Sequence, residues 1–415
     1  MNHELLFKRI LELLSAMLSN GGDPGAVTKY AKILCEKYGF SEVNVLLGNF
    51  DFQASAMSPD GRPIYAIIPF ELGESNFTKV SKLFNYCIEV FRKLPDADEI
   101  KRRTDEIVNQ NYQKKVERYI AAILGGVGFS VMFACTYVDC MIACLASVLI
   151  VLIGSFIEKF TPNTFIYNAV VSLVAEYVIL ISYHFGWCQH PDRITIGVVM
   201  LLISGLGITN GIWYVVSRNV GVGVQKINDS VVGALGIALG IGAPMLTIRM
   251  GEIEAFMLHP NFVIQTLACT IACVGFGMWF VSEKKLLPYI AIGALLTWLT
   301  YSLVFYFRPI LFTATLAAAV VEGFYALLIS YKIKCSPIII LTVAIFPLIP
   351  GPNLFYMLYG IVTQNYAMAG SEGVALIVTC VAIAFGNSMM YLLERMIVTR
   401  RKKKGKNKFN IDIEF

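Results

Sequence analysis

Long apolar stretches follow one another between residues 119 and 397, and they constrain this chain more than any other feature. A helix needs about 20 apolar residues to cross the hydrocarbon core of a bilayer. Ten such stretches can be placed, near residues 119–138, 140–157, 165–185, 194–216, 230–248, 262–282, 287–306, 309–331, 336–350 and 373–397. The second and ninth are short, and prolines interrupt the ninth. The sequence predicts an α-helical polytopic membrane protein with about ten transmembrane helices.

The composition excludes other classes of protein. Apolar residues make up 56% of the chain and charged residues 15%, whereas soluble domains usually carry about 25% charged residues. A soluble enzyme, a fibrous protein and a disordered scaffold are therefore excluded. Seven basic residues lie between Arg400 and Lys408, directly after the last apolar stretch. That position is typical of an anchor on anionic lipid headgroups, so we expect a lipid bilayer and no nucleic acid as a partner.

Basic residues in the loops predict the orientation. An even number of spans places both chain ends on one side of the membrane. Loops on the proposed inner side carry seven basic residues, namely Lys159, Arg218, Lys226, Lys284, Lys285, Lys332 and Lys334, against Arg193, Arg249 and Arg308 outside. The positive-inside rule then predicts a multi-pass protein of the cell membrane with cytoplasmic N and C termini. Residues 398–415 form a basic cytosolic tail.

Residues 1–118 have a different pattern and are predicted to form a cytosolic α+β head. Helices are expected over 4–19, from Asp23-Pro24 to 37, over 76–92 and over 96–117, with strands at 43–47, 52–57 and 63–68. The head has neither a nucleophile elbow nor a phosphate-binding glycine loop. A structural or regulatory role is favoured over catalysis, and the acidic residues between 96 and 106 are interpreted as a solvated helix face.

The ten cysteines predict neither a disulfide framework nor a metal site. Two pairs, Cys140/Cys144 and Cys269/Cys273, have helical spacing but lack histidine or acidic partners at ligand spacing. Packing inside apolar helices is favoured, because a free cysteine behaves there as a small hydrophobic residue. We expect no metal and no cofactor.

An internal repeat appears when the sequence is shifted by 146 residues. The shift places 202–205 on 348–351, 215–219 on 361–365, 237–240 on 383–386, and Glu176 on Glu322. A constant offset predicts two five-span repeats, 119–250 and 251–397. Because five is odd, the second repeat enters the membrane with opposite orientation, which is typical of secondary transporters. We expect an axis in the membrane plane, with the third and eighth spans facing each other.

Glu176 and Glu322 occupy the middle of the third and eighth spans. A carboxylate at the bilayer centre costs roughly 2.5–3.5 kcal/mol on insertion scales, so such residues normally face a cavity or a partner. Loss of hydration favours the neutral acid, as a proton-coupled site requires. The alternative is a neutral glutamic acid hydrogen-bonded to a neighbouring helix.

Helix-breaking residues occupy corresponding places in the fourth and ninth spans. They are Ser204-Gly205-Leu206-Gly207 and Pro347-Leu348-Ile349-Pro350-Gly351-Pro352. Paired breaks in corresponding spans indicate a binding site near the midplane, with a packing kink as the alternative. Neutral polar residues near the breaks are Thr209, Asn210, Asn353 and Asn387, and Asp139 is either a pathway residue or a loop or helix-end residue.

A head, five spans, five further spans and the segment Pro347-Leu348-Ile349-Pro350-Gly351 together resemble the threonine/serine exporter family. The family's PLVPG corresponds to that segment. Its LxPGLxxTNAIRD segment is similar to residues 202–214, which keep Gly205, Thr209 and Asn210 but have Ser204 for proline and Trp213-Tyr214 for Arg-Asp. The resemblance implies export of small hydroxylated amino acids or small dicarboxylates, driven by the proton gradient.

The leading hypothesis is therefore a proton-driven secondary exporter of threonine/serine-like amino acids, and not an enzyme. Its partners are a small-molecule substrate and protons, and a homo-oligomer is left open. The predicted pathway residues are Glu176, Glu322, Asp139, Gly205, Thr209, Asn210, Pro350, Gly351 and Asn353. The alternatives are an exporter of dicarboxylates such as succinate, a passive channel, and a membrane-tethered enzyme or sensor acting through the head.

The basic-residue count generates a topological prediction. In a background without reactive native cysteines, an impermeant thiol reagent should label a cysteine placed at Gln189 in intact cells, and not one placed at Asn407. The opposite labelling pattern would show that the orientation is reversed.

Overall fold

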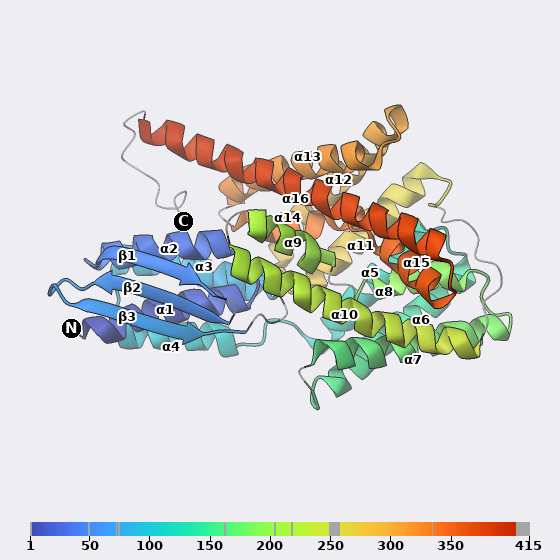
Figure 1. Ribbon diagram of the computed structural model, residues 1–415, viewed down its shortest axis with the longest axis horizontal. Helices are drawn as coiled ribbons and strands as arrows, with labels where there is room; N and C mark the ends of the chain where they lie inside the picture. The colour runs from blue at the N-terminus through green and yellow to red at the C-terminus, as the bar shows by residue number, and fades with distance from the viewer. Residues whose placement is uncertain are drawn as a thin grey trace.

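The computed structural model describes residues 2–48, 50–71, 73, 75–161, 163–202, 205–216, 219–248, 258–333 and 335–403. Within these ranges the side chains of Leu206, Thr209, Trp213, Val216, Tyr391 and 393–403 are not described. Figure 1 shows a small sheet with helices at one end of the molecule and a large helical region at the other.

The head contains a three-stranded antiparallel sheet in the order β1-β2-β3 and four helices. Its elements are α1 (His3–Ser19), α2 (Pro24–Lys37), β1 (Ser41–Leu47), β2 (Asp51–Met57), β3 (Pro63–Pro69), α3 (Phe77–Lys93) and α4 (Ala97–Asn109). The Asp23 carboxylate accepts from the Ala26 N–H at 2.7 Å, which caps α2 before Pro24. Alternate residues of β2 (Phe52, Ala54 and Ala56) are buried. The predicted helix starts and strands of this domain are confirmed.

One predicted helix of the head is wrong. The sequence predicts a helix over 96–117, but α4 ends at Asn109 and α5 (Lys115–Met132) begins after a connection at 110–114. The Glu117 carboxylate accepts from the Lys114 N–H at 3.1 Å, as in a capping box. That local hydrogen bond starts a new helix, so one run of helix-forming residues becomes two helices.

The helical region continues with eleven further α-helices and two short 3-10 helices. They are α6 (Tyr137–Ile157), α7 (Thr164–His184), α8 (Pro191–Val199), α9 (Gly205–Val216), α10 (Val220–Thr247), α11 (Phe262–Trp279), η1 (Lys284–Leu286), α12 (Leu287–Phe307), α13 (Leu311–Ile333), α14 (Pro337–Ala344), η2 (Phe346–Leu348), α15 (Gly351–Val362) and α16 (Tyr366–Lys403). Among the described residues, seven helices are long and apolar enough to cross a membrane. The number becomes eight if α14 and α15, bent by 52°, form one span. The chain is a polytopic membrane protein, and the count of ten remains a prediction.

The two halves of the helical region have corresponding helices and corresponding contacts. In the first half α5 packs on α6, α7 on α10, and α9 on α10; in the second α11 packs on α12, α13 on α16, and α15 on α16. The half-helices α8 and α14 begin at Pro191 and Pro337, and α9 and α15 begin at Gly205 and Gly351. Both pairs of starting points have the spacing of the sequence repeat.

The closest packing between the halves joins α5 and α11, which run antiparallel. Gly275 lies against Ala121 and Gly125, whereas the other end of the contact places Gly128 against Ala268 and Ala272. Small residues let two helix backbones approach closely where both are surrounded by lipid. The first and sixth predicted spans therefore form a close contact between the halves.

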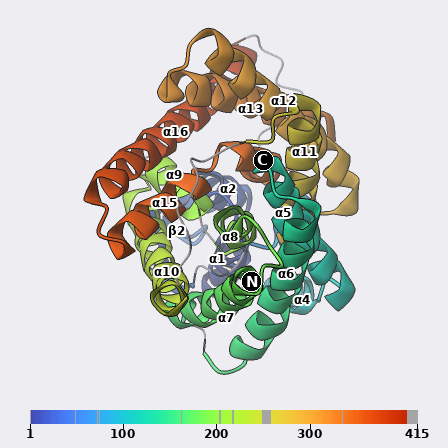
Figure 2. The same cartoon turned by 90° about the vertical axis from the view of Figure 1, so that its right-hand side faces the viewer.

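The predicted pairing of the third and eighth spans is wrong. These spans are α7 and α13, and Figure 2 shows them on opposite sides of a ring of helices that surrounds α8. α8 lies between them, and the halves meet through α5 with α11 and through α9 with α16. Glu176 and Glu322 therefore lie in separate parts of the molecule.

The head docks on the connection between α11 and α12. The backbone N–H of Phe77 donates to the Phe280 carbonyl at 3.0 Å, and the N–H of Thr78 donates to the Val281 carbonyl at 2.9 Å. The Phe280 ring lies 5.8 Å from Phe77 and 5.7 Å from Phe346, which is in η2. Further contacts are Gln113 Nε2 to Met278 O at 2.7 Å, Lys284 Nζ to Glu117 Oε1 at 2.6 Å, and Ser81 to Glu283. The Phe280 ring thus links the head to the break between α14 and α15.

The glycine contact between α5 and α11 generates a stability prediction. A Cβ atom at Gly275 would lie 2.6 Å from the Gly125 nitrogen and 2.9 Å from the Ala121 carbonyl oxygen. Gly275→Leu should therefore destabilise the protein by about 1–3 kcal/mol or more, as overpacking does. The matched control is Gly370→Leu in α16, where nothing lies within 4 Å. Equal melting temperatures of the two purified variants would contradict the close packing of α11 on α5 at Gly275.

Candidate functional site

The short helix α8 lies at the centre of the helical region and carries polar residues into it. All nine of its residues are buried, among them Asp192, Arg193 and Thr195. It contacts α5, α6, α7 and α15, which come from both halves of the chain. A buried polar half-helix needs partners for its side chains, and these partners define the candidate site.

Glu176 of α7 faces Thr195 of α8. Its Oε2 atom lies 2.8 Å from Thr195 Oγ1, and the residue is 1% exposed. Oε1 has no hydrogen-bond partner within the described part of the chain. Glu176 therefore lies inside the protein against α8 rather than toward lipid, as both interpretations of its sequence position require.

The hydroxyl of Thr195 has two acceptors but only one hydrogen. Thr195 Oγ1 lies 2.9 Å from the Pro191 carbonyl oxygen as well as 2.8 Å from Glu176 Oε2. The hydroxyl donates to Glu176 Oε2, and its hydrogen is shared with the Pro191 carbonyl in a three-centre bond. A proton on Glu176 would instead let the carboxyl donate to Thr195 and would leave the hydroxyl hydrogen for Pro191.

Glu322 of α13 has a different environment. It is fully buried, and neither carboxyl oxygen has a hydrogen-bond partner among the residues that the structure describes. At the repeat spacing, the position that corresponds to Thr195 is Leu341 of α14. The neighbouring Thr342 is also buried, and its hydroxyl likewise has no partner in the described ranges. Both glutamates are buried, but only Glu176 has a hydroxyl partner among the described residues.

A second polar contact joins the two halves directly and was missed in the sequence. Tyr356 of α15 donates its hydroxyl to Asp192 Oδ2 at 3.3 Å, and Asp192 is 6% exposed. The neighbouring Arg193 donates to the Ala134 carbonyl at 3.1 Å. Both charged residues fall in the first turn of α8, where the sequence suggests a loop. The signal that could have found them is Pro191, which marks a helix start.

The breaks of the fourth and ninth predicted spans meet in space. Met200 follows the end of α8, and its sulfur packs against Gly351, the first residue of α15. The Leu201 side chain packs against Gly125 of α5, where an added Cβ atom would lie 3.0 Å from it. Gly205 begins α9 and Pro350 precedes α15. α8 and α14 therefore end, and α9 and α15 begin, in one central region.

The remaining polar residues near the breaks have separate positions. Asn353 donates from Nδ2 to Glu372 Oε2 at 2.7 Å, linking α15 to α16. Asn210 is half-buried in α9, and Asn387 is buried in α16. The side chain of Thr209 and the whole of Ser204 lie outside the described residues.

Asp139 has the geometry of a helix cap. It lies in the first turn of α6 and accepts from the backbone N–H of Thr136 at 2.9 Å. It also accepts from the Gln189 N–H at 2.8 Å and contacts His190 Nδ1 at 2.9 Å. The second span is thus a 21-residue helix rather than a short one, and Asp139 ties its start to the loop before α8.

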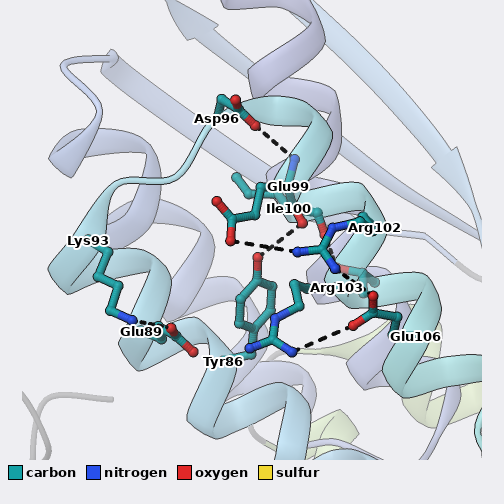
Figure 3. Close-up of polar contacts among 10 residues, drawn as sticks. Tyr86, Glu89, Lys93, Asp96, Glu99, Ile100, Arg102, Arg103 and Glu106 are labelled. Atoms are coloured by element: carbon teal, nitrogen blue, oxygen red, sulfur yellow. Dashed lines mark hydrogen bonds and ion pairs between the residues drawn. The ribbon is translucent and has the colours of Figure 1, made fainter.

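Charged residues of the head form ordinary surface pairs. Figure 3 shows Arg102 between Glu106, at 2.6 Å, and Glu99, at 3.9 Å, all on α4. Exposed pairs of this kind contribute little to stability. Burial raises the pKa of Cys35 and of Cys87 to about 12, so neither thiol is a ready nucleophile.

Comparison with known proteins identifies the family. Residues 9–248 match the family model for the threonine/serine exporter, and residues 265–393 match a second model of threonine/serine exporters. The chain belongs to the threonine/serine exporter family. The resemblance stated from its PLIPG segment is confirmed, and the family is one of transport proteins rather than enzymes.

A curated relative in this exporter family comes from Corynebacterium glutamicum and is named threonine/serine exporter. It is 21% identical over 389 residues, which cover 89% of this chain and 78% of that protein. No solved structure matches this chain. The first matched region ends just after α10, at residue 248, and the second begins in the first turn of α11, at residue 265.

The contact between Glu176 and Thr195 generates a spectroscopic prediction. At neutral pH the infrared spectrum of the exporter should contain the carbonyl band of a protonated carboxylic acid that Glu176→Gln removes. Thr195→Val should shift this band to higher frequency because the hydrogen bond is lost, whereas Thr195→Ser should leave it in place. A Glu176→Gln spectrum without a missing acid band would contradict the protonated state.

Proposed function

We propose that this exporter moves threonine- and serine-like amino acids out of the cell, coupled to protons entering the cell. It would lie in the cell membrane with both termini in the cytoplasm. The observation that carries the proposal is the contact of Glu176 with Thr195 of α8, a helix that also packs on α15 of the broken span, in a chain of this family. Substrate and proton would then share one central region.

The helix ends at the breaks suit a zwitterion. α9 and α15 begin there, and helix N-termini favour a carboxylate; α8 and α14 end there, and helix C-termini favour an ammonium group. The first N–H groups of α15 have no partner inside that helix, and Pro352 contributes none. A small amino acid carries both a carboxylate and an ammonium group, the two charges that these ends would favour.

Glu176 is the proposed proton-carrying group. Release of its proton would place a negative charge next to the Thr195 hydroxyl, which would then rotate away from the Pro191 carbonyl to donate to the carboxylate. A proton gained or lost would in this way move a hydrogen bond of α8. Because Met200 at the end of α8 touches Gly351, the change would reach both breaks. Glu322 would be the weaker partner, since it lacks an equivalent hydroxyl.

An inverted repeat would supply the alternating access that export needs. Three observations support it: the repeat spacing of the half-helix starts, the corresponding contacts within each half, and the antiparallel packing of α5 on α11. Two equivalent helices that run antiparallel are related by an axis perpendicular to them, and thus in the membrane plane. Exchange of the two halves' conformations would then open the centre first to one side and then to the other.

The docked head argues against a merely tethered enzyme or sensor. The Phe77–Phe280–Phe346 contacts join it to the helix break rather than leaving it on a linker. An enzyme that only needs an anchor has no use for buried polar half-helices in its spans. We propose that the head supports the transport region.

Transport in proteoliposomes tests the function. We expect an imposed pH gradient to drive accumulation of threonine and serine, and not of succinate. Glu176→Gln should reduce gradient-driven transport at least about a hundred-fold while preserving threonine–threonine exchange, because glutamine cannot release a proton. Glu322→Gln should have a smaller effect, and the double variant should resemble Glu176→Gln. The exposed head substitution Glu36→Gln serves as the control.

Wild-type gradient-driven rates in Glu176→Gln would overturn proton coupling through this residue. Succinate accumulation without threonine transport would overturn the substrate class. Flux of threonine that does not respond to the pH gradient at all would show a passive channel instead.

A further inference from the structure

Two contacts join α8 of the first half to α15 of the second half. Met200, just after α8, packs against Gly351 at the start of α15. About two helical turns before Met200, Asp192 Oδ2 accepts from the Tyr356 hydroxyl at 3.3 Å, and Tyr356 lies about one and a half turns after Gly351. The two half-helices therefore run antiparallel, and the hydrogen bond lies beyond the centre, toward the start of α8.

The hydrogen bond lies on the side of the centre that faces away from the head. Figure 1 shows α9 and α14 nearer to the head than α8 and α15. The end of α8 meets the start of α15 at the centre, so the start of α8 and the end of α15 point away from the head. With the head in the cytoplasm, Asp192 and Tyr356 would lie between the centre and the outside of the cell.

The same hydrogen bond crosses the boundary between the two halves. The start of α8 is held within the first half, where Arg193 donates to a backbone carbonyl of the α5–α6 connection at 3.1 Å and His190 Nδ1 lies 2.9 Å from Asp139 Oδ2. Tyr356 belongs to the second half. A displacement of the halves that opens this side would separate Tyr356 from Asp192 and leave the other two contacts in place.

The corresponding positions on the head side cannot form such a bond. At the repeat spacing of 146 residues, Tyr356 corresponds to Asn210 of α9, and Asp192 corresponds to Ile338 of α14. An isoleucine side chain neither donates nor accepts a hydrogen bond. On the side away from the head the pair is polar and buried, since Asp192 is 6% and Tyr356 4% exposed. Hydrogen bonds to an ionised group are the stronger ones, so the two sides differ in what opening would break.

We propose that Tyr356 and Asp192 form the outer gate of the exporter. Their hydrogen bond closes the path from the centre to the outside, and release of substrate requires it to break. This inference rests on the transport function proposed above. In the closed form the tyrosine hydroxyl serves the buried carboxylate as a donor, and in the open form water takes its place. Opening toward the cytoplasm would have no equivalent bond to break.

Thiol labelling of intact cells tests the gate. Met200→Cys, in a background without other reactive cysteines, places a thiol at the centre, where an impermeant thiol reagent reaches it when the outer side opens. The labelling rate follows the open population even when that population is small. Tyr356→Phe removes the hydroxyl but keeps the ring, and should raise this rate at least about five-fold. Adding Asp192→Asn should then raise it little further, because the bond is already lost.

Two controls separate a gate from a general loosening of the protein. Tyr306→Phe removes a hydroxyl from a residue of α12 that is 82% exposed, and it should leave the rate unchanged. The native Cys269 of α11 is 0% exposed, and as the sole cysteine it should label as slowly with Tyr356→Phe as without it. An equal rise at Met200→Cys and at Cys269 would show destabilisation and would overturn the proposal.

A Met200→Cys labelling rate that Tyr356→Phe leaves unchanged would also overturn the gate, as would no labelling with or without this substitution. A cysteine at Gln189 serves in the same cells as the positive control for access from outside. The labelling needs neither threonine nor a pH gradient, so a wrong substrate or coupling ion would not affect its result. Conversely, gradient-driven threonine transport by the wild-type protein would stand if the gate failed.

Discussion

Inside a bilayer every backbone N–H and C=O group needs a partner within the protein, and this requirement determines where the helices of this exporter can break. The end of α8 and the start of α15 lie at the centre of the helical region. α8 is wholly buried, and Met200 at its end packs against Gly351 at the start of α15. Away from lipid, the backbone groups released by the breaks are available to a polar substrate. The proposed binding region is therefore the place where the helices break.

Small residues decide how the two halves meet. Gly125, Gly128 and Gly275 bring α5 and α11 into close antiparallel contact, and this pair forms part of the ring of helices around α8. Glu176 and Glu322 belong to α7 and α13, on opposite sides of that ring. Within the described residues Thr195 of α8 offers a hydroxyl to Glu176, whereas neither carboxyl oxygen of Glu322 has a hydrogen-bond partner. Asymmetry between otherwise corresponding halves gives the exporter one strong candidate for proton binding.

Local signals in the head were sufficient to predict most of its elements. Asp23 before Pro24 and the alternation of apolar residues in β2 specify structure through neighbours in the chain. The end of α4 was not predictable in this way, because the pattern over 96–117 is helical throughout. The capping bond of Glu117 to Lys114 and the contact of Gln113 with Met278 end one helix and begin another. The second contact joins residues far apart in sequence, so no local pattern reports it.

The sequence by itself determined that this protein crosses the membrane many times, has a separate α+β head and belongs with threonine/serine exporters. Hydropathy, helix caps and the PLIPG segment depend on residues close together in the chain, so they can be recognised without the fold. Only the tertiary structure decided that Thr195 faces Glu176, that Tyr356 reaches Asp192, and that Asp139 caps a helix. Those contacts depend on which helices pack together, and small residues of distant segments set that packing.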